Sequence, residues 1–124
     1  MTRLLKQADA KRLDLPGRVS LEPVSGAIGS RVSFRIAEIA AAKPGDTPRG
    51  PHLHHDFEEC IYVLSGQGAM HAESGVYTAG SGDILLVPAG EKHMTVNTGS
   101  EPLRLLCFFP VPDVTTGTTE FKSF

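Results

Sequence analysis

The sequence predicts an all-β protein whose short strands form a sandwich or a barrel. After residue 16, glycine and proline recur at short intervals and leave few gaps that could hold a long helix. Between these breaks lie short runs in which apolar and polar residues alternate, or in which β-branched and aromatic residues are enriched. Many short strands at regular spacing are typical of sandwiches and barrels.

The first sixteen residues have two interpretations. Leu4, Leu5 and Ala8 could form one face of a short helix that ends at Pro16, or the segment could be an extended arm. The first clear strand is at 32–37, where Val, Phe and Ile alternate with Ser, Arg and Ala. This alternation predicts a half-buried strand.

Further strands are predicted from β-rich or apolar runs that end at turn residues. They lie at 60–64, 69–72, 83–87 and 103–109. The last of these is apolar on both faces apart from Arg104, so we expect both of its faces to be covered, one of them by a partner subunit. The small polar residues 115–119 predict a tail that is mobile or draped over a partner.

Composition excludes several classes of function. The 124 residues carry a formal net charge of −2 and no basic stripe, which argues against a nucleic acid or an anionic membrane as the partner. No apolar run approaches the roughly 20 residues that span a bilayer, and charges interrupt the N-terminal segment too often for a signal peptide. The two cysteines, Cys60 and Cys107, are expected to be reduced thiols in a cytoplasmic protein.

Three of the five histidines fall within residues 52–55. On a strand, His52 and His54 point to the same side and lie about 6.6 Å apart along the chain, a spacing that suits two imidazoles at one ion. A carboxylate follows at Glu58 or Glu59. Only one of the two can face the interior, and strand parity does not choose between them because both faces of the next strand look buriable.

A second informative segment runs from 82 to 93. Pro88 suits the second position of a β-turn and Gly90 suits the fourth, so the turn ends one strand and delivers His93 at the start of the next. A third imidazole from another strand could therefore complete a site with His52 and His54.

These two segments closely resemble the two sequence motifs of the cupins. The first motif reads His-x-His, three or four residues, Glu, six residues, Gly, and is met by His52, His54, Glu59 and Gly66. The second reads Gly, five residues, Pro-x-Gly, two residues, His, three residues, Asn, and is met by Gly82, Pro88, Gly90, His93 and Asn97. The first motif usually opens with a Gly six residues before its first His. Position 46 is Asp here, and Gly45 lies one place away.

The resemblance implies a double-stranded β-helix, or jelly-roll barrel, that spans 1–124 as one domain. In this division 1–16 is an N-terminal arm, 17–111 is the barrel and 112–124 is a C-terminal tail. The resemblance also selects Glu59 over Glu58. It implies that one divalent transition metal ion, Mn, Fe, Co, Ni or Zn, is held by His52, His54, Glu59 and His93.

The implied function is that of a metal-dependent enzyme acting on a small oxygen-bearing molecule: a dioxygenase, decarboxylase, isomerase or lyase. Two alternatives are a small-ligand binding or sensor barrel without turnover and a barrel whose metal is only structural. A homodimer is expected from the apolar strand at 103–109 and from the habit of the family. Pocket-lining residues could include Arg35, Met70, His71 and Phe108. We expect His55, Glu58 and Lys92 to form a solvated rim, and Asn97 to fix the backbone.

Overall fold

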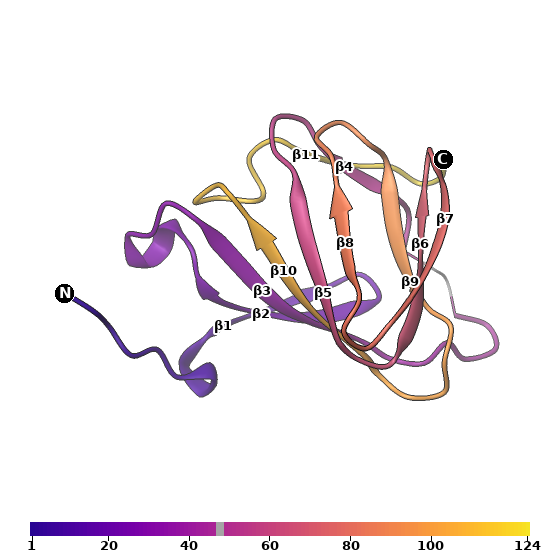
Figure 1. The fold of residues 1–124 in the computed structure, drawn as a ribbon, viewed down its shortest axis with the longest axis horizontal. Helices are drawn as coiled ribbons and strands as arrows, with labels where there is room; N and C mark the ends of the chain where they lie inside the picture. The colour runs from indigo at the N-terminus through magenta and orange to yellow at the C-terminus, as the bar shows by residue number, and fades with distance from the viewer. Residues whose placement is uncertain (47–48) are drawn as a thin grey trace.

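The structure is a computed structural model that describes residues 1–46 and 49–124, and it confirms the all-β jelly-roll expectation. Two antiparallel sheets make up the fold (Figure 1). The larger sheet has the strand order β1-β2-β3-β10-β5-β8, and the smaller has the order β11-β4-β9-β6-β7.

The described strands are short and are joined by turns. The larger sheet contains β1 (Lys11–Leu15), β2 (Arg18–Val24), β3 (Ser33–Ile39), β10 (Leu103–Phe109), β5 (Glu59–Ser65) and β8 (Ile84–Val87). The smaller sheet contains β11 (Thr118–Glu120), β4 (His52–His54), β9 (His93–Asn97), β6 (Gln67–Ala72) and β7 (Gly75–Gly80). Two single 3-10 turns, η1 (Gln7–Asp9) and η2 (Gly26–Ile28), are the helical elements of the described residues. No helix in the described part of the chain is long and apolar enough to cross a membrane.

The core lies between the inner faces of the two sheets. Its buried apolar side chains come mainly from β3, β5 and β10 of the larger sheet and from Met70 and Ala79 of the smaller one. The turn that closes the first motif depends on glycine, because Gly66 has φ +90° and an added Cβ would lie 2.7 Å from the Pro102 carbonyl oxygen. This turn lets β6 leave β5 and cross to the other sheet.

Strands β2 and β3 turn polar side chains inward and apolar ones outward, the opposite of a strand that packs its apolar face on the core. Their polar residues, including Ser20, Glu22 and Arg35, line an internal cavity, whereas Phe34 and Ile36 face outward. The sequence alternation at 32–37 correctly predicts the strand, but its apolar face is the outer one. The inner face is polar because this end of the barrel encloses the cavity rather than packed core.

The outer face of the larger sheet carries continuous apolar rows, since residues paired across strands point to the same side. Strand register places Leu21, Ile36, Leu106, Tyr62 and Ile84 in one row, and Val24, Phe34, Phe108, Cys60 and Leu86 in the next. Ile84 is 68% exposed and Leu86 is 62% exposed. The described residues therefore leave the outer face of β8 exposed and cover that of β10 only in part.

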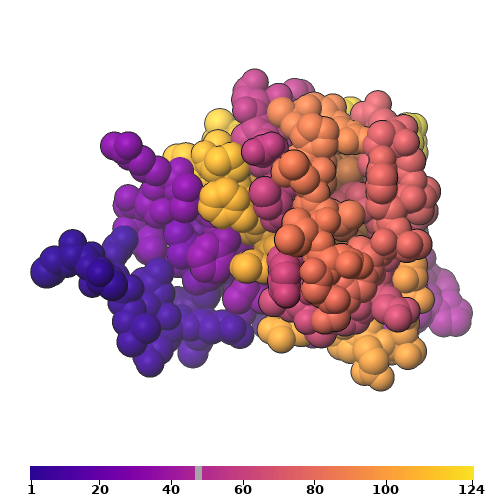
Figure 2. All heavy atoms as spheres, in the orientation of Figure 1, coloured from indigo at the N-terminus to yellow at the C-terminus, as the bar shows by residue number. Residues whose placement is uncertain are grey.

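The two terminal segments differ from their sequence interpretation. Residues 11–15 of the expected arm form β1, which pairs with β2 at the edge of the larger sheet. The most N-terminal residues extend to one side of the molecule (Figure 2). Residues 118–120 of the expected polar tail form β11, which pairs with β4, so this part of the tail belongs to the smaller sheet of the same chain. Threonine favours strands, and this explains the pairing of a polar segment.

Candidate metal centre

Three strands bring together the four side chains named by the motifs. Strand β4 supplies His52 and His54, whereas Glu59 and His93 are the first residues of β5 and β9. His52 is paired directly with His93 across β4 and β9, and the centres of their rings are 4.3 Å apart. One nitrogen or oxygen from each of the four lies within 4.8 Å of the others, and all four residues are buried. The group can therefore hold a metal ion, and Glu58, which is exposed, takes no part.

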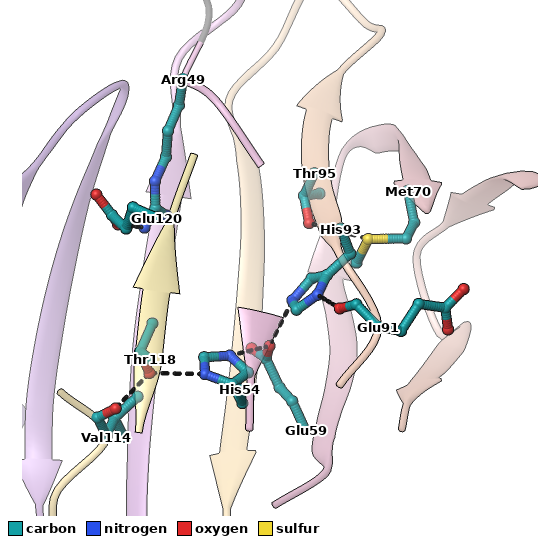
Figure 3. A network of polar contacts seen from close by, with 10 residues as sticks. All are labelled: Arg49, His54, Glu59, Met70, Glu91, His93, Thr95, Val114, Thr118 and Glu120. Carbon is teal, nitrogen blue, oxygen red and sulfur yellow. Dashed lines mark hydrogen bonds and ion pairs between the residues drawn. The ribbon is translucent and has the colours of Figure 1, made fainter. Parts of the chain in front are cut away.

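A hydrogen bond from β11 orients His54 (Figure 3). Its Nδ1 lies 2.8 Å from Thr118 Oγ1, and the Thr118 hydroxyl donates its single proton to the Val114 carbonyl. Thr118 can then only accept from His54, so the Nδ1 atom carries the ring proton and the lone pair is on Nε2. Phe57 stacks on the same imidazole with ring centres 4.9 Å apart, and this packing fixes the ring plane.

His93 is oriented by the same logic. Its Nδ1 lies 2.9 Å from the carbonyl oxygen of Glu91, which can only accept a hydrogen bond. The lone pair of His93 is therefore also on Nε2. The Nε2 atoms of His54 and His93 lie 3.3 Å and 3.2 Å from the same Glu59 oxygen, Oε1.

Acceptor atoms thus converge on one another, and this arrangement requires a cation. A carboxylate oxygen and two imidazole lone pairs repel unless a positive centre lies among them, and either a proton or a metal ion can supply it. The buried Nδ1 of His52 has no hydrogen-bond partner among the described residues. Three imidazoles and one carboxylate are a mixed nitrogen and oxygen donor set that suits a divalent first-row transition metal. The residues present therefore fit such an ion.

The protonation of the group also fits metal binding. Burial, reinforced by the nearby His93 and by the positive charge of Arg49, lowers the pKa of His52 to about 2, so its ring is neutral at physiological pH. Burial alone would raise the pKa of Glu59. A proton shared with His54 and His93, in the place that an ion would take, outweighs that effect and holds the pKa of this carboxyl well below its usual range. The ring of His52 and the carboxyl of Glu59 are thus already deprotonated, as metal ligands must be.

The centre opens onto an internal cavity of about 420 Å³. His52, His54 and Glu59 line one side of it, and residues of β1, β2, β3 and the segment 112–120 line the rest. His93 is 1% exposed and lies behind this surface. The volume is in the usual range of sites for small molecules.

Comparisons with known proteins agree with this geometry. A family model described as "Cupin domain" matches residues 39–109, which is more than half of the chain. The chain belongs to the cupin family. No curated protein sequence matched this cupin.

Solved structures with the same fold include oxalate decarboxylases. The formate complex of the Lactobacillus farciminis enzyme aligns with a TM-score of 0.75 and 22% identity over 92% of the cupin and 34% of that enzyme. A mutant of the Bacillus subtilis enzyme aligns with a TM-score of 0.77 and 17% identity over 93% of the cupin and 31% of that enzyme. At these identities the likeness establishes the fold, and the cupin spans about a third of the length of each enzyme.

The expected pocket residues are only partly confirmed. Arg35 lines the cavity of the cupin, but Met70, His71 and Phe108 are not among its lining residues. Phe108 faces outward because its neighbour Phe109 faces inward, and Met70 is 2% exposed within the core. Asn97 fixes the backbone as expected, since its amide nitrogen donates to the carbonyl oxygens of Ile39 and Glu101.

Sequence reasoning missed three residues near the centre. Arg18 and Arg49 line the cavity, and Thr118 orients His54. Polar and apolar residues alternate from Arg18 to Glu22, which could have indicated a strand with a polar inner face. Nothing in the local sequence marks Thr118, because its role comes from the pairing of β11 with β4.

Proposed function

We propose that this cupin binds one divalent transition metal ion through His52, His54, Glu59 and His93 and acts as an enzyme on a small oxygen-bearing molecule. One observation carries the proposal. The ring protons of His54 and His93 are held on Nδ1 by hydrogen bonds, so the free Nε2 atoms converge with the Glu59 carboxylate at the wall of a cavity of about 420 Å³. Such an arrangement leaves room for a ligand beside the ion.

The protein residues would divide the work as follows. Thr118 and the Glu91 carbonyl hold two imidazoles in the tautomer that presents Nε2 to the ion. Glu59 supplies the negative charge, and the surrounding barrel limits the access of water. When bound, a divalent metal of this kind supplies Lewis-acid polarisation of a carbonyl or carboxylate oxygen.

The structural neighbours indicate which chemistry to test first. Their published descriptions name oxalate decarboxylase, a bound formate, and Mn(II) centres in the Bacillus subtilis enzyme. We therefore place manganese first among the metals and decarboxylation of a small carboxylate first among the reactions. A panel of candidate substrates for the dioxygenase, isomerase and lyase classes is tested as well, because the cupin spans only about a third of the length of those enzymes.

The alternatives make a different prediction about water at the ion. A structural site is closed by protein ligands, whereas a catalytic site keeps a position for water or substrate. The proton relaxation of water in solutions of the Mn²⁺-loaded protein distinguishes the two. We expect a strong enhancement from water that exchanges at the ion. Its absence would favour a structural metal, and exchange without turnover of any panel compound would favour a binding or sensor barrel.

Metal binding itself is tested by a matched pair of variants. Glu59→Gln keeps the shape of the side chain but removes the charged ligand, whereas Glu58→Gln makes the same change at the exposed neighbour. Metal analysis of protein purified without an affinity tag and calorimetric titration with Mn²⁺ give the readout. We expect Glu59→Gln to lose at least tenfold in affinity and Glu58→Gln to match the wild type. Equal affinity in all three proteins would refute the ligand assignment.

We also propose that the protein is a cytoplasmic homodimer. The apolar rows on the outer face of the larger sheet support a dimer, because exposed apolar patches of this extent commonly mark contact surfaces. A second copy would cover the exposed face of β10. Both cysteines are free thiols, and this supports a reducing compartment.

A further inference from the structure

We propose that Arg18, together with Arg49, binds an anionic oxygen group of the molecule that occupies the cavity, so that the ligand of this site is a small oxyanion. The inference rests on the proposed function and specifies its ligand class. The shared chemistry is that of a carboxylate or a phosphate group, either of which matches the planar donors of a guanidinium.

Arg18 differs from the other arginines on the cavity wall, because each of those forms an ion pair with a carboxylate. Arg35 Nε lies 2.7 Å from Glu22 Oε2, and Arg49 pairs with Glu120. Glu59 faces the imidazoles, and Asp113 accepts hydrogen bonds from Thr115 and Thr116. Lys11 is exposed to solvent. Among the described residues, Arg18 makes no ion pair with any carboxylate.

Burial makes this lack of a partner costly. The Nε atoms of Arg18 and Arg49 are both buried and have no hydrogen-bond partner among the described residues. A buried donor without an acceptor destabilises the fold, and more so when it is charged. Burial also lowers the pKa of Arg18, and the positive charge of Arg49, which lines the same cavity, lowers it further, so the two guanidinium groups repel each other. An oxyanion at the pair would accept their hydrogen bonds and remove the repulsion.

The two arginines lie beside the metal centre. Arg49 is three residues before His52, and its positive charge lowers the pKa of His52. The negative charge of Glu59 raises the pKa of Arg18, against the effect of burial. Figure 3 shows Arg49 and Glu120 above Thr118 and His54, with Arg49 in the segment that leads into β4. Both arginines line the cavity of about 420 Å³ that His52, His54 and Glu59 also line. A small oxyanion held by Arg18 and Arg49 would therefore present its other end toward the metal-binding group.

The experiment compares ligand binding to the Mn²⁺-loaded wild type and three variants by calorimetry. Arg18→Gln removes the charge, Arg18→Lys keeps the charge but loses the planar donors, and Arg31→Gln is the matched control at an exposed arginine. The probes are oxalate, inorganic phosphate and uncharged oxamide, each added to desalted protein. We expect Arg18→Gln to weaken oxyanion binding at least tenfold, Arg18→Lys to weaken it less, and Arg31→Gln to have no effect. Whichever of oxalate and phosphate binds more tightly shows whether the oxyanion is a carboxylate or a phosphate.

Thermal unfolding checks the fold and supplies a second readout. Removing an unpaired buried cation should leave the melting temperature of the ligand-free protein unchanged or raise it. The oxyanion should raise the melting temperature of the wild type by more than that of Arg18→Gln. Equal oxyanion affinity in wild type and Arg18→Gln, or tighter binding of oxamide than of either oxyanion, would overturn the inference.

Failure of the proposed metal site would give a different experimental result from failure of the inference about Arg18. Mn²⁺ titration of the wild type and of Arg18→Gln measures that site directly, and we expect equal metal affinity in both. A wild type that binds no metal refutes the proposed function, whereas the oxyanion titrations can still be run on the metal-free protein. Normal metal binding with no effect of Arg18→Gln on oxyanions refutes only the inference about Arg18.

Discussion

The hydroxyl of Thr118 offers a direct test of how the metal centre is organised. It accepts from His54 Nδ1 at 2.8 Å and donates to the Val114 carbonyl, so it fixes the imidazole tautomer from outside the centre. Thr118→Val keeps the branched shape of the side chain but removes the acceptor. The His54 ring can then move its proton to Nε2, and Nε2–H can no longer bind a metal.

The size of the effect follows from this role. Loss of a hydrogen-bond partner behind a metal-binding histidine typically costs 10–100-fold in metal affinity, which is about 1.4–2.8 kcal/mol. We therefore expect calorimetric titration with Mn²⁺ to show Thr118→Val weakened by this factor. Thr118→Ser retains the hydroxyl and should bind within a few fold of the wild type.

The chain provides a matched control at the next residue. Thr119 Oγ1 lies 2.7 Å from Nε2 of the exposed His55, so Thr119→Val removes a similar contact on the solvent side of β11. Metal affinity should not change in this variant. If Thr118→Val and Thr119→Val bind Mn²⁺ equally well, the tautomer argument is wrong, and the orientation of His54 has another cause.

Three further outcomes are expected. Gly66→Ala should unfold at a lower denaturant concentration than Gly29→Ala, because both have positive φ but only Gly66 has a neighbouring carbonyl 2.7 Å from the added Cβ. The extra cost should be about 1–3 kcal/mol, and equal midpoints would contradict it. His52 has a folded-state pKa of about 2, below its ordinary value of 6.5, so the unfolded chain binds the extra proton. Stability of the metal-free protein should therefore be full above pH 6.5 and fall as the pH drops below it, by up to about 1.4 kcal/mol per pH unit. Urea unfolding between pH 5 and 8 measures this dependence, and a flat profile would argue against a buried neutral ring. Phe108→Lys should convert the proposed dimer to a monomer in sedimentation experiments, whereas Val76→Lys, at a 61% exposed position on β7, should leave it intact. A dimer that persists in Phe108→Lys would place the interface elsewhere.

Much of the fold, and the set of residues that meet at the metal centre, could be predicted from the spacing of residues in the sequence. A separation of two residues on a strand placed His52 and His54 on one side, and the turn at Pro88 and Gly90 placed His93 at the start of β9. Strand parity could not choose between Glu58 and Glu59, because it says which residues share a face but not which face is inner. The spacing to Gly66 chose Glu59, which is buried.

What could not be predicted depends on contacts between distant segments. Local sequence does not reveal that the apolar face of β3 is the outer one, which turns Arg35 inward. Nor does it reveal that Phe108 on β10 faces outward. Arg18 and Thr118 reach the cavity through pairing at the two ends of the chain, β2 with β3 and β11 with β4. Strand register of this kind is set by the closed barrel as a whole.

The pairing of β11 with β4 makes the metal centre sensitive to proteolysis near the C-terminus. A single cut between Val114 and Thr118 would release both the group behind His54 and the carboxylate that pairs with Arg49. The strands that carry the donor atoms would stay covalently intact. A preparation clipped there would show the full set of motif residues by sequencing and still bind metal poorly, so intact mass should be checked before any metal content is interpreted.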